Sequence, residues 1–286
     1  MDLTIIITTL NNKKMLKECI DSVKKYTTTV SYEIIVVDNH SSDGTQNMIR
    51  VEYPDIQLIA NEKNLGFHKA NNKALRIAKG RYSVLLNDDT YITHDALGKI
   101  VKFMDANQNV GVCGPKLLNI DGSIQQHGSI LAFYKLRSKT PIDIGLIIGA
   151  CMFIRMSIIP KVGLLDENLF FYHDDLDYCL RVKAAGYKVM YFPESEVYHY
   201  GGVSSKKTKR SSLYFIEGIR GGLYFCKKHY QYPVYLIYRV FLLATALFMI
   251  PVSMLTYPLN KERIRTYTEI LRIILKEELM SNISLV

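Results

Sequence analysis

The sequence lacks both of the glycine-rich motifs that commonly bind nucleotide phosphates. No G-x-G-x-x-G follows the first expected strand, which removes the main support for a dinucleotide-binding Rossmann domain. No G-x-x-x-x-G-K followed by Ser or Thr occurs either, so a Walker loop is not indicated. A phosphate bound by this chain would therefore need another counter-charge, for which a metal ion is the better candidate.

Paired cysteines and a secretory leader are also missing. The five cysteines are odd in number and form no C-x-x-C pair, so neither a zinc knuckle nor a disulfide framework is indicated. A reducing compartment is the natural expectation. The first residues, Met1-Asp2-Leu3-Thr4, lack the positively charged start of a signal peptide, and we expect no such peptide here.

Net positive charge is almost absent from the first part of the chain and is concentrated in the last part. Residues 1–200 hold 23 Lys and Arg against 22 Asp and Glu, whereas residues 201–286 hold 13 against 5. The overall hydrophobic content of 48% is that of a globular protein with a core. A basic tail suits nucleic acid or an anionic membrane, and the apolar runs within this tail favour the membrane.

Apolar, β-branched runs alternate with helical patterns through the first 90 residues. The expected strands are residues 3–9, 32–37, 56–60 and 82–86, and the expected helices are residues 13–26 and 69–78. This alternation predicts a doubly wound, mostly parallel α/β sheet, in which ligands bind at the carboxyl ends of the strands.

The expected strand 82–86 runs directly into Asn87-Asp88-Asp89. Unpaired carboxylates are costly to bury, so these side chains must face a cleft at the end of the strand. Carboxylate and amide oxygens suit Mg²⁺ or Mn²⁺, and we expect a metal that carries a diphosphate. If the tripeptide is considered alone, the alternative interpretation is that its carboxylates are loop side chains exposed to solvent.

Further elements are expected beyond this point. A helix is expected over 93–107, a strand–turn–strand over 110–128 with its turn at Asp121-Gly122, and a strand over 187–193. Gly149-Ala150 breaks the apolar run 144–155, and small residues there allow a ligand to approach the backbone. Close strand packing explains these two residues equally well.

A second acidic cluster, Asp174, Asp175 and Asp177, opens a helix that is expected from the apolar spacing behind it. Carboxylates favour the first turn of a helix, although capping explains one acid better than three. A carboxylate at the cleft can also serve as a general base toward an attacking hydroxyl. The aromatic run 170–172 before it is either an acceptor platform or part of the core.

His199 precedes Gly201-Gly202 and a basic segment over residues 203–211. An imidazole that binds metal beside such a segment suits closure over a diphosphate. A structural histidine followed by a solvated linker is the alternative.

The tail is expected to be helical and apolar. Residues 240–257 carry no charge and reach about the minimum length of a spanning helix, although we expect Pro251 to interrupt them. Helices that lie in or re-enter the cytoplasmic leaflet are favoured, a single spanning helix comes second and a soluble dimer interface third. Residues 262–280 read as an amphipathic helix.

Several short stretches together point to one family. They are Ile7–Asn11, Val37-Asp38-Asn39 with Ser42–Thr45, Asn64–Phe67 with Asn72, Leu86–Asp89, Gly149-Ala150, Asp166-Glu167, Asp174–Asp177 with Arg181, Ala185–Tyr187 and His199–Gly202. In order and spacing these residues resemble the inverting GT-A glycosyltransferases of family 2, especially the rhamnosyltransferase-like branch. The resemblance covers roughly residues 1–205.

The resemblance implies a role for each matching residue. It places Asp175 as the catalytic base and Asp89 and His199 as metal ligands. It places Thr8, Leu10, Asp38, Asn64, Gly66, Asn72, Asn87, Asp88, Gly149, Ala150, Asp174 and Arg181 at the nucleotide or substrate. Two positions depart from the family pattern: Asn87 stands where D-x-D has its first aspartate, and Asp174 replaces a glutamate.

The resemblance also implies an activity. The chain would move a sugar, rhamnose being one possibility, from a dTDP- or UDP-linked donor to a hydroxyl of a lipid-linked glycan, with Mn²⁺ or Mg²⁺, in cell-surface polysaccharide synthesis at the cytoplasmic membrane face. Residues 1–205 would form the GT-A domain and residues 206–286 the basic loop and membrane-associating helices, with a homo-oligomer possible. A nucleotidyltransferase of related fold and an inactive membrane-bound scaffold are the alternatives.

Overall fold

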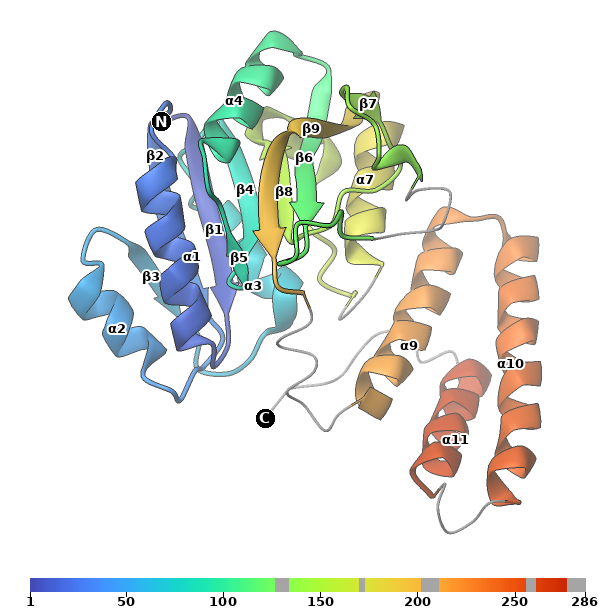
Figure 1. The fold of residues 1–286 in the computed structure, drawn as a ribbon. Coiled ribbons are helices and arrows are strands. Elements are labelled where there is room, and N and C mark those ends of the chain that lie inside the picture. The colour runs from blue at the N-terminus through green and yellow to red at the C-terminus, as the bar shows by residue number, and fades with distance from the viewer. Residues whose placement is uncertain (127–133, 170–172, 202–210, 256–260, 277–286) are drawn as a thin grey trace. The chain divides into compact units, whose positions relative to one another are not determined.

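The computed structural model describes residues 1–126, 134–169, 173–201, 211–255 and 261–276 (Figure 1). The chain forms two compact units. The sheet unit is built mainly from Met1–Leu165 and Asp175–Ser204, and the helical unit from Asp166–Asp174 and Ser205–Ile283. The expected division of the chain at residue 205 stays a prediction.

The first half of the sheet unit is a parallel sheet. Its strands are β1 (Leu3–Thr9), β2 (Tyr32–Asp38), β3 (Gln57–Ala60) and β4 (Tyr82–Asn87), in the order β3-β2-β1-β4. The register pairs Thr9 with Asp38 and Thr8 with Asn87, so these strands end at one common edge. The helices between them are α1 (Lys13–Tyr26), α2 (Thr45–Glu52) and α3 (Gly66–Leu75).

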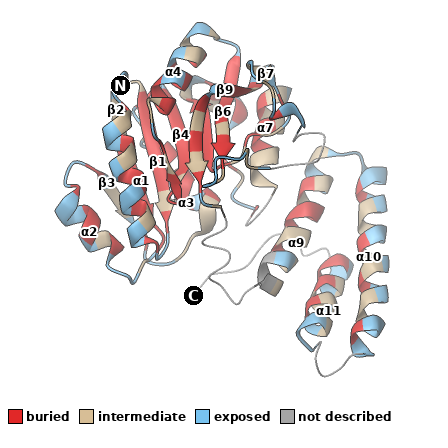
Figure 2. Cartoon of the chain, in the orientation of Figure 1, coloured by how far each residue is buried: buried red, intermediate tan, exposed pale blue. Residues whose placement is uncertain are grey.

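Helices cover both faces of this parallel sheet. One face packs the odd-numbered side chains of β1 against the buried stripe of α1, including Ile5, Leu16 and Ile20. The other face packs Ile6 of β1 against α3 through Ala70 and its neighbours. Burial on both faces explains why β1 and β2 are almost continuously apolar (Figure 2).

Beyond β4 the sheet is mixed. The remaining strands are β5 (Thr90–Tyr91), β6 (Val110–Leu118), β7 (Ile142–Asp143), β8 (Cys151–Arg155) and β9 (Lys188–His199), and the path continues β4-β8-β6-β9-β5. Strand β8 runs antiparallel to both β4 and β6, whereas β9 is parallel to β6. The helical elements of this half are α4 (Ala96–Ala106), η1 (Met156–Ile158), α6 (Ile159–Val162) and α7 (Asp174–Ala184).

Two expected strand boundaries are wrong, for physical reasons. The strand expected over 187–193 runs on to His199, because Pro193 falls where the register of β9 against β6 shifts and its missing N–H breaks no ladder. The second strand expected after the Asp121-Gly122 turn is only an isolated bridge between Leu118 and Ile124. Residues 127 and 128 lie outside the described part of the chain.

The helical unit contains α9 (Ser211–His229), α10 (Tyr232–Met254) and α11 (Lys261–Lys276). Their shared core includes Leu223, Leu242 and Ile270. Helix α10 continues through Pro251 to Met254, so the expected interruption at this proline is wrong. Pro251 gives up its own hydrogen bond to the carbonyl four residues earlier, but the following turn still closes, with the Leu255 N–H donating to the Pro251 carbonyl at 3.1 Å. Among the described helices, α10 alone is long and apolar enough to cross a membrane, judged by length and composition only.

Candidate active site

The acidic turn after β4 lies at the common edge where the parallel strands end. Thr9, the last residue of β1, donates a hydrogen bond from Oγ1 to Oδ2 of Asp88 at 2.6 Å. Thr8 donates to the Asn71 side chain at 3.2 Å. Asp88 is buried, so the threonine holds a carboxylate that would otherwise be costly to desolvate. Asp88 is thereby fixed at the strand ends, and its predicted ligand contact stays a prediction.

Asp38 ends β2, and one of its two carboxylate oxygens lacks a hydrogen-bond partner among the described residues. Its Oδ2 accepts hydrogen bonds from the Ser41 N–H at 3.0 Å and the Gln46 amide at 2.7 Å. Its Oδ1 is buried and has no hydrogen-bond partner among the described residues. Buried acceptors are normally satisfied, so an orphaned one points to a missing donor. A nucleobase is one such donor, and the predicted hydrogen bond from it to Asp38 stays a prediction.

The backbone is unusual beside the same strand ends. Asn11 and His40 have positive φ values of 52° and 73°, and they follow β1 and β2 respectively. Such conformations persist only where the surroundings hold them, and they concentrate at functional sites. Leu10, which is predicted to line the base pocket, is 38% exposed.

Three further predicted residues lie in α3 or just before it. Asn64 accepts the Gly66 N–H at 2.9 Å, and Gly66 itself has a φ of 77° that favours glycine. Asn72 donates to the Leu165 carbonyl at 2.9 Å and accepts the Leu165 N–H at 3.1 Å. The carboxamide of Asn72 therefore fixes the backbone of Leu165, which gives it a positioning role in this structure. Its substrate contact stays a prediction.

Asp89 and His199 meet across the β5–β9 ladder. Thr90 pairs with His199 in this ladder, and the Tyr200 N–H donates to the Asp89 carbonyl at 3.0 Å. As a result Asp89 Oδ1 lies 3.1 Å from His199 Nε2, although the two residues are far apart in the sequence. Both side chains are almost fully buried.

Gln125 sets the orientation of the imidazole. Its Oε1 lies 2.7 Å from His199 Nδ1, and its Nε2 donates to the Asn119 side chain and to the His199 carbonyl, each at 3.2 Å. Because this assignment makes Oε1 an acceptor, Nδ1 carries a proton and donates it. Nε2 is then directed at Asp89 and at the Asn87 amide, 3.3 Å away. Metal-binding histidines are typically oriented by such a partner on the other nitrogen.

This pair fits one divalent cation. Two neighbouring ligands of an octahedral ion at about 2.1 Å lie about 3.0 Å apart, close to the observed Asp89–His199 separation of 3.1 Å. Within the described residues no third His, Cys, Asp or Glu joins them. A two-ligand protein site suits Mg²⁺ or Mn²⁺, whose remaining positions are commonly filled by water and substrate phosphates.

Asp175 lies beside the turn at Gly149-Ala150, which is hydrogen-bonded to the end of β4. A Cβ added to Gly149 would lie 3.0 Å from Asp175 Oδ1 and 2.8 Å from the Phe67 ring, so a side chain at this position would displace one or both of these groups. The next residue, Ala150, accepts the Asn87 N–H at 3.0 Å. Gly149 and Ala150 thus bring the predicted base beside the end of β4. Asp174 is the first residue of α7.

The contacts of Arg181 stabilise the packing of α7. Its Nε donates to Asp177 at 2.8 Å and its Nη1 to the Val162 carbonyl at 2.7 Å. Nη2 is buried and has no hydrogen-bond partner in the described structure. The predicted substrate contact of Arg181 stays a prediction, while its observed contacts fix α7 behind Asp175.

Cys19 of α1 also touches the acidic turn. Its thiol lies 3.6 Å from the Asn87 carbonyl and 3.6 Å from Thr90 Oγ1. Burial raises the pKa of this thiol to about 12, despite the hydrogen bond with Thr90. The thiol is therefore neutral and packs against the acidic turn.

Sequence reasoning missed Thr9, Asn71 and Gln125. Gln125 follows an irregular turn and belongs to no motif, so only the fold reveals that it orients His199. The expected aromatic platform at 170–172 and the basic segment up to residue 210 lie outside the described residues.

Comparisons with known proteins agree on the family. The model of glycosyl transferase family 2 matches residues 4–163. An N-acetylglucosaminyl-diphospho-decaprenol L-rhamnosyltransferase of Mycobacterium tuberculosis is 25% identical over 63% of this chain and 70% of its own length. The dTDP-rhamnosyl transferase RfbF of Shigella flexneri is 26% identical over 61% and 62%. The uncharacterized protein y4gI of Sinorhizobium fredii is 30% identical over 70% of this chain, which spans only 24% of that protein.

Solved structures agree on the fold. A mannosyltransferase of Pyrobaculum calidifontis, in complex with GDP-Man and Mn²⁺, covers 96% of this chain and 87% of its own, with a TM-score of 0.61 and 17% identity. Staphylococcus aureus TarS matches 77% of this chain and 38% of its own, with a TM-score of 0.59 and 19% identity. With the family model spanning more than half of its residues, this chain belongs to glycosyl transferase family 2, adopts the GT-A fold and is a glycosyltransferase.

Proposed function

We propose that this glycosyltransferase is metal-dependent and inverting, and that it transfers a sugar from a nucleotide-diphosphate donor to a hydroxyl of a glycan acceptor. The observation that carries the proposal is the buried Asp89–His199 pair, with Nε2 directed at the carboxylate by Gln125. Asp89 and His199 would hold Mn²⁺ or Mg²⁺, which supplies positive charge to stabilise a departing diphosphate.

Of the other protein residues, one acts on the donor and one on the acceptor. Asp38 would accept a hydrogen bond from the nucleobase of the donor at Oδ1, which has no partner among the described residues. Asp175 takes the proton of the acceptor hydroxyl, whose oxygen forms a bond to the anomeric carbon from the face opposite the diphosphate. The bond from that carbon to the diphosphate oxygen breaks in the same displacement, which inverts the configuration.

The names of the relatives narrow the choice of donor and acceptor within this proposal. Two of them are rhamnosyltransferases, one named for a dTDP donor and one for a decaprenol-diphosphate acceptor. Another is a poly(ribitol-phosphate) beta-glucosyltransferase of Bacillus spizizenii. We therefore favour a dTDP- or UDP-linked donor, with rhamnose as the first sugar to test, and a lipid-linked acceptor in cell-surface polysaccharide synthesis.

The helical unit supports a membrane location within the same proposal. Phe241 and Phe248 of α10 are 64% and 68% exposed, and no charge occurs between residues 240 and 255. Basic residues predominate in residues 201–286, where anionic lipid headgroups would attract them. We favour helices that lie in the cytoplasmic leaflet, and a spanning α10 remains the alternative.

A donor panel tests the proposal. The purified chain is given dTDP-rhamnose, UDP-glucose, UDP-N-acetylglucosamine or GDP-mannose with Mn²⁺, and the release of nucleotide diphosphate is measured. We expect release from at least one donor, its loss in EDTA and a large decrease in Asp89→Asn. Asp55→Asn, which removes a surface carboxylate paired with Lys24, is the control and should match the wild type. No release from any donor would contradict the proposal and favour an inactive scaffold.

A further inference from the structure

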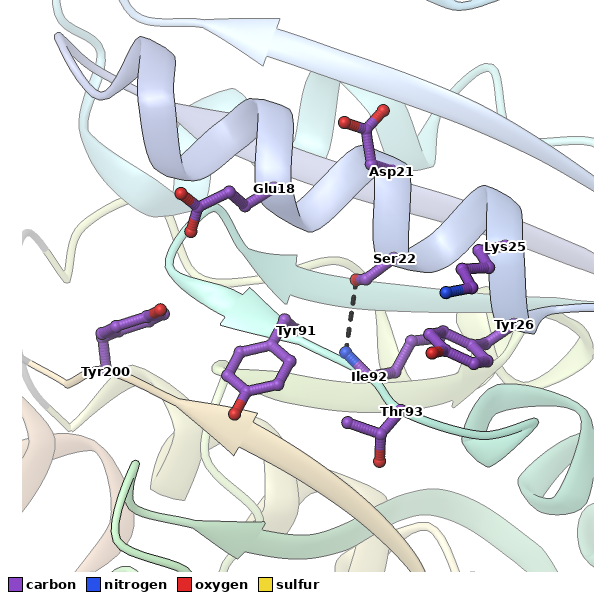
Figure 3. A pocket seen from close by; sticks show the side chains of 9 residues that line it. All are labelled: Glu18, Asp21, Ser22, Lys25, Tyr26, Tyr91, Ile92, Thr93 and Tyr200. Atoms are coloured by element: carbon purple, nitrogen blue, oxygen red, sulfur yellow. Dashed lines mark hydrogen bonds between the residues drawn. The ribbon is translucent and has the colours of Figure 1, made fainter.

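An open groove of about 430 Å³ lies in the sheet unit between one side of α1 and the β5–β9 edge (Figure 3). We propose that this groove binds a neutral oligosaccharide, as a second glycan site separate from the sugar-transfer site. The inference rests on the proposed function only in taking the glycan to be the acceptor chain. The volume is in the range of small-ligand sites in proteins.

The floor of the groove is fixed. Ile92, which follows β5, is buried and donates its N–H to Ser22 Oγ of α1 at 3.2 Å, as the dashed line in Figure 3 shows. Ser22 Oγ in turn donates to the Cys19 carbonyl at 2.8 Å. A floor tied to α1 by these bonds needs little ordering when a ligand binds, which lowers the entropic cost of association.

Tyrosines form the walls. Tyr91 and Tyr200 lie near each other along the groove, with ring centroids 6.0 Å apart, and Tyr26 lies farther along it (Figure 3). Tyr91 is backed by Tyr198, stacked at 4.8 Å with an interplanar angle of 9°. Tyr200 is 39% exposed. Such rings present an apolar face with a polar tip, which matches a pyranose with its C–H face and hydroxyl rim.

The charges in the groove disfavour an anionic ligand. The Asp21 carboxylate already accepts the Tyr53 hydroxyl at 2.7 Å. Glu18 is exposed and has no hydrogen-bond or ion-pair partner in the described part of the chain, so it can accept hydrogen bonds from two sugar hydroxyls. The Lys25 amino group lies over the Tyr26 ring, 4.9 Å from its centroid. A single cation beside two carboxylates suits a neutral glycan better than a phosphate.

Two tyrosines of the groove are close neighbours in sequence of the proposed metal ligands. Tyr91 lies two residues after Asp89, and Tyr200 directly follows His199. The Tyr200 N–H donates to the Asp89 carbonyl at 3.0 Å, so the wall of the groove and the metal pair share one piece of backbone. A glycan in the groove would therefore be held on the same edge of the molecule as the transferred sugar.

Calorimetric titration of the 286-residue chain with three tetrasaccharides tests this site. The probes are a rhamnose tetrasaccharide, chitotetraose and maltotetraose. We expect at least one to bind the wild type, and Tyr200→Ala and Glu18→Gln each to raise its Kd about tenfold or more. Tyr134→Ala, which removes a 62% exposed tyrosine outside the groove, is the matched control and should leave the Kd within twofold. Thermal unfolding midpoints of all variants verify that they fold.

Either of two results would overturn the inference. One is that no tetrasaccharide binds the wild type, and the other is that the groove variants bind as well as the control. These results are separate from the donor panel: a chain that releases nucleotide from a donor but fails this titration keeps the proposed function and loses the second glycan site.

Discussion

Val51 and Ile237 are each 70% exposed, one in the sheet unit and one in the helical unit, yet their surroundings differ. Val51 is a single apolar residue at the end of α2, beside charged neighbours. Ile237 belongs to a row of exposed apolar side chains that continues along α10 through Phe241 and Phe248. A lone exposed apolar residue is ordinary, whereas a row of them marks a surface that another apolar phase covers.

The two units therefore use their apolar residues for different purposes. In β1 and β2 these residues are buried on both faces of the sheet, and the polar side chains are gathered at the strand ends where chemistry is proposed. In α10 only one side packs against α9 and α11, and the rest stays exposed. The comparison thus distinguishes the sheet unit, which forms the candidate active site, from the helical unit, which we propose binds a membrane.

The largest expected effect lies in the sheet unit. Asp175→Asn removes the proposed base and should lower sugar transfer about 10³-fold, within the range for loss of a general base. The Kd of the nucleotide should stay within twofold of the wild type, because the Asp175 carboxylate does not contact the nucleotide. Asp121→Asn, at an exposed turn, is the control for loss of a carboxylate. Transfer by Asp175→Asn at near wild-type rates would assign the base elsewhere.

A pair of truncations should separate the two units by stability. Ile6→Ala removes a fully buried side chain of β1 and should lower the free energy of unfolding by about 2–5 kcal/mol. Phe241→Ala, on the exposed side of α10, should change it by about 0.5 kcal/mol or less. Urea unfolding followed by circular dichroism measures both. Equal losses would mean that the side of α10 carrying Phe241 packs against protein.

Gln125→Leu tests how His199 is oriented. Loss of its acceptor frees the imidazole to rotate, so the Mn²⁺ concentration for half-maximal activity should rise about 10–100-fold. Saturating Mn²⁺ should restore most of the activity, because the ligands themselves remain. Asn119→Ala removes the neighbouring hydrogen bond of Gln125 and should have little effect. An unchanged Mn²⁺ dependence in Gln125→Leu would exclude this role.

The smallest expected effect concerns the membrane. Ile237→Glu puts a charge on the apolar row and should lower binding to vesicles of phosphatidylglycerol and phosphatidylcholine about tenfold. Val51→Glu is the matched control, because its exposure is the same and no apolar row surrounds it. Co-sedimentation measures both. If the two variants bind equally well, α10 does not contact the bilayer through this row.

The parallel half of the fold was predictable from the sequence because continuous β-branched runs such as 3–9 indicate strands buried on both faces. The mixed half was not, since nothing local indicates that β8 enters between β4 and β6 in the antiparallel sense. The same limit applies to the site. Asp89 and His199 belong to readable motifs, whereas Gln125 is recognised only when the fold brings its carboxamide to Nδ1.

Titration with Mn²⁺ tests the central claim most directly, because it asks whether Asp89 and His199 hold a metal together. Electron paramagnetic resonance of free Mn²⁺ reports its binding to the wild type, Asp89→Asn, His199→Ala and the control Asp55→Asn in the presence of UDP. We predict that the wild type and Asp55→Asn bind one Mn²⁺ with the same Kd, and that each site variant raises the Kd at least about tenfold. Unchanged Mn²⁺ binding in both site variants would contradict the claim.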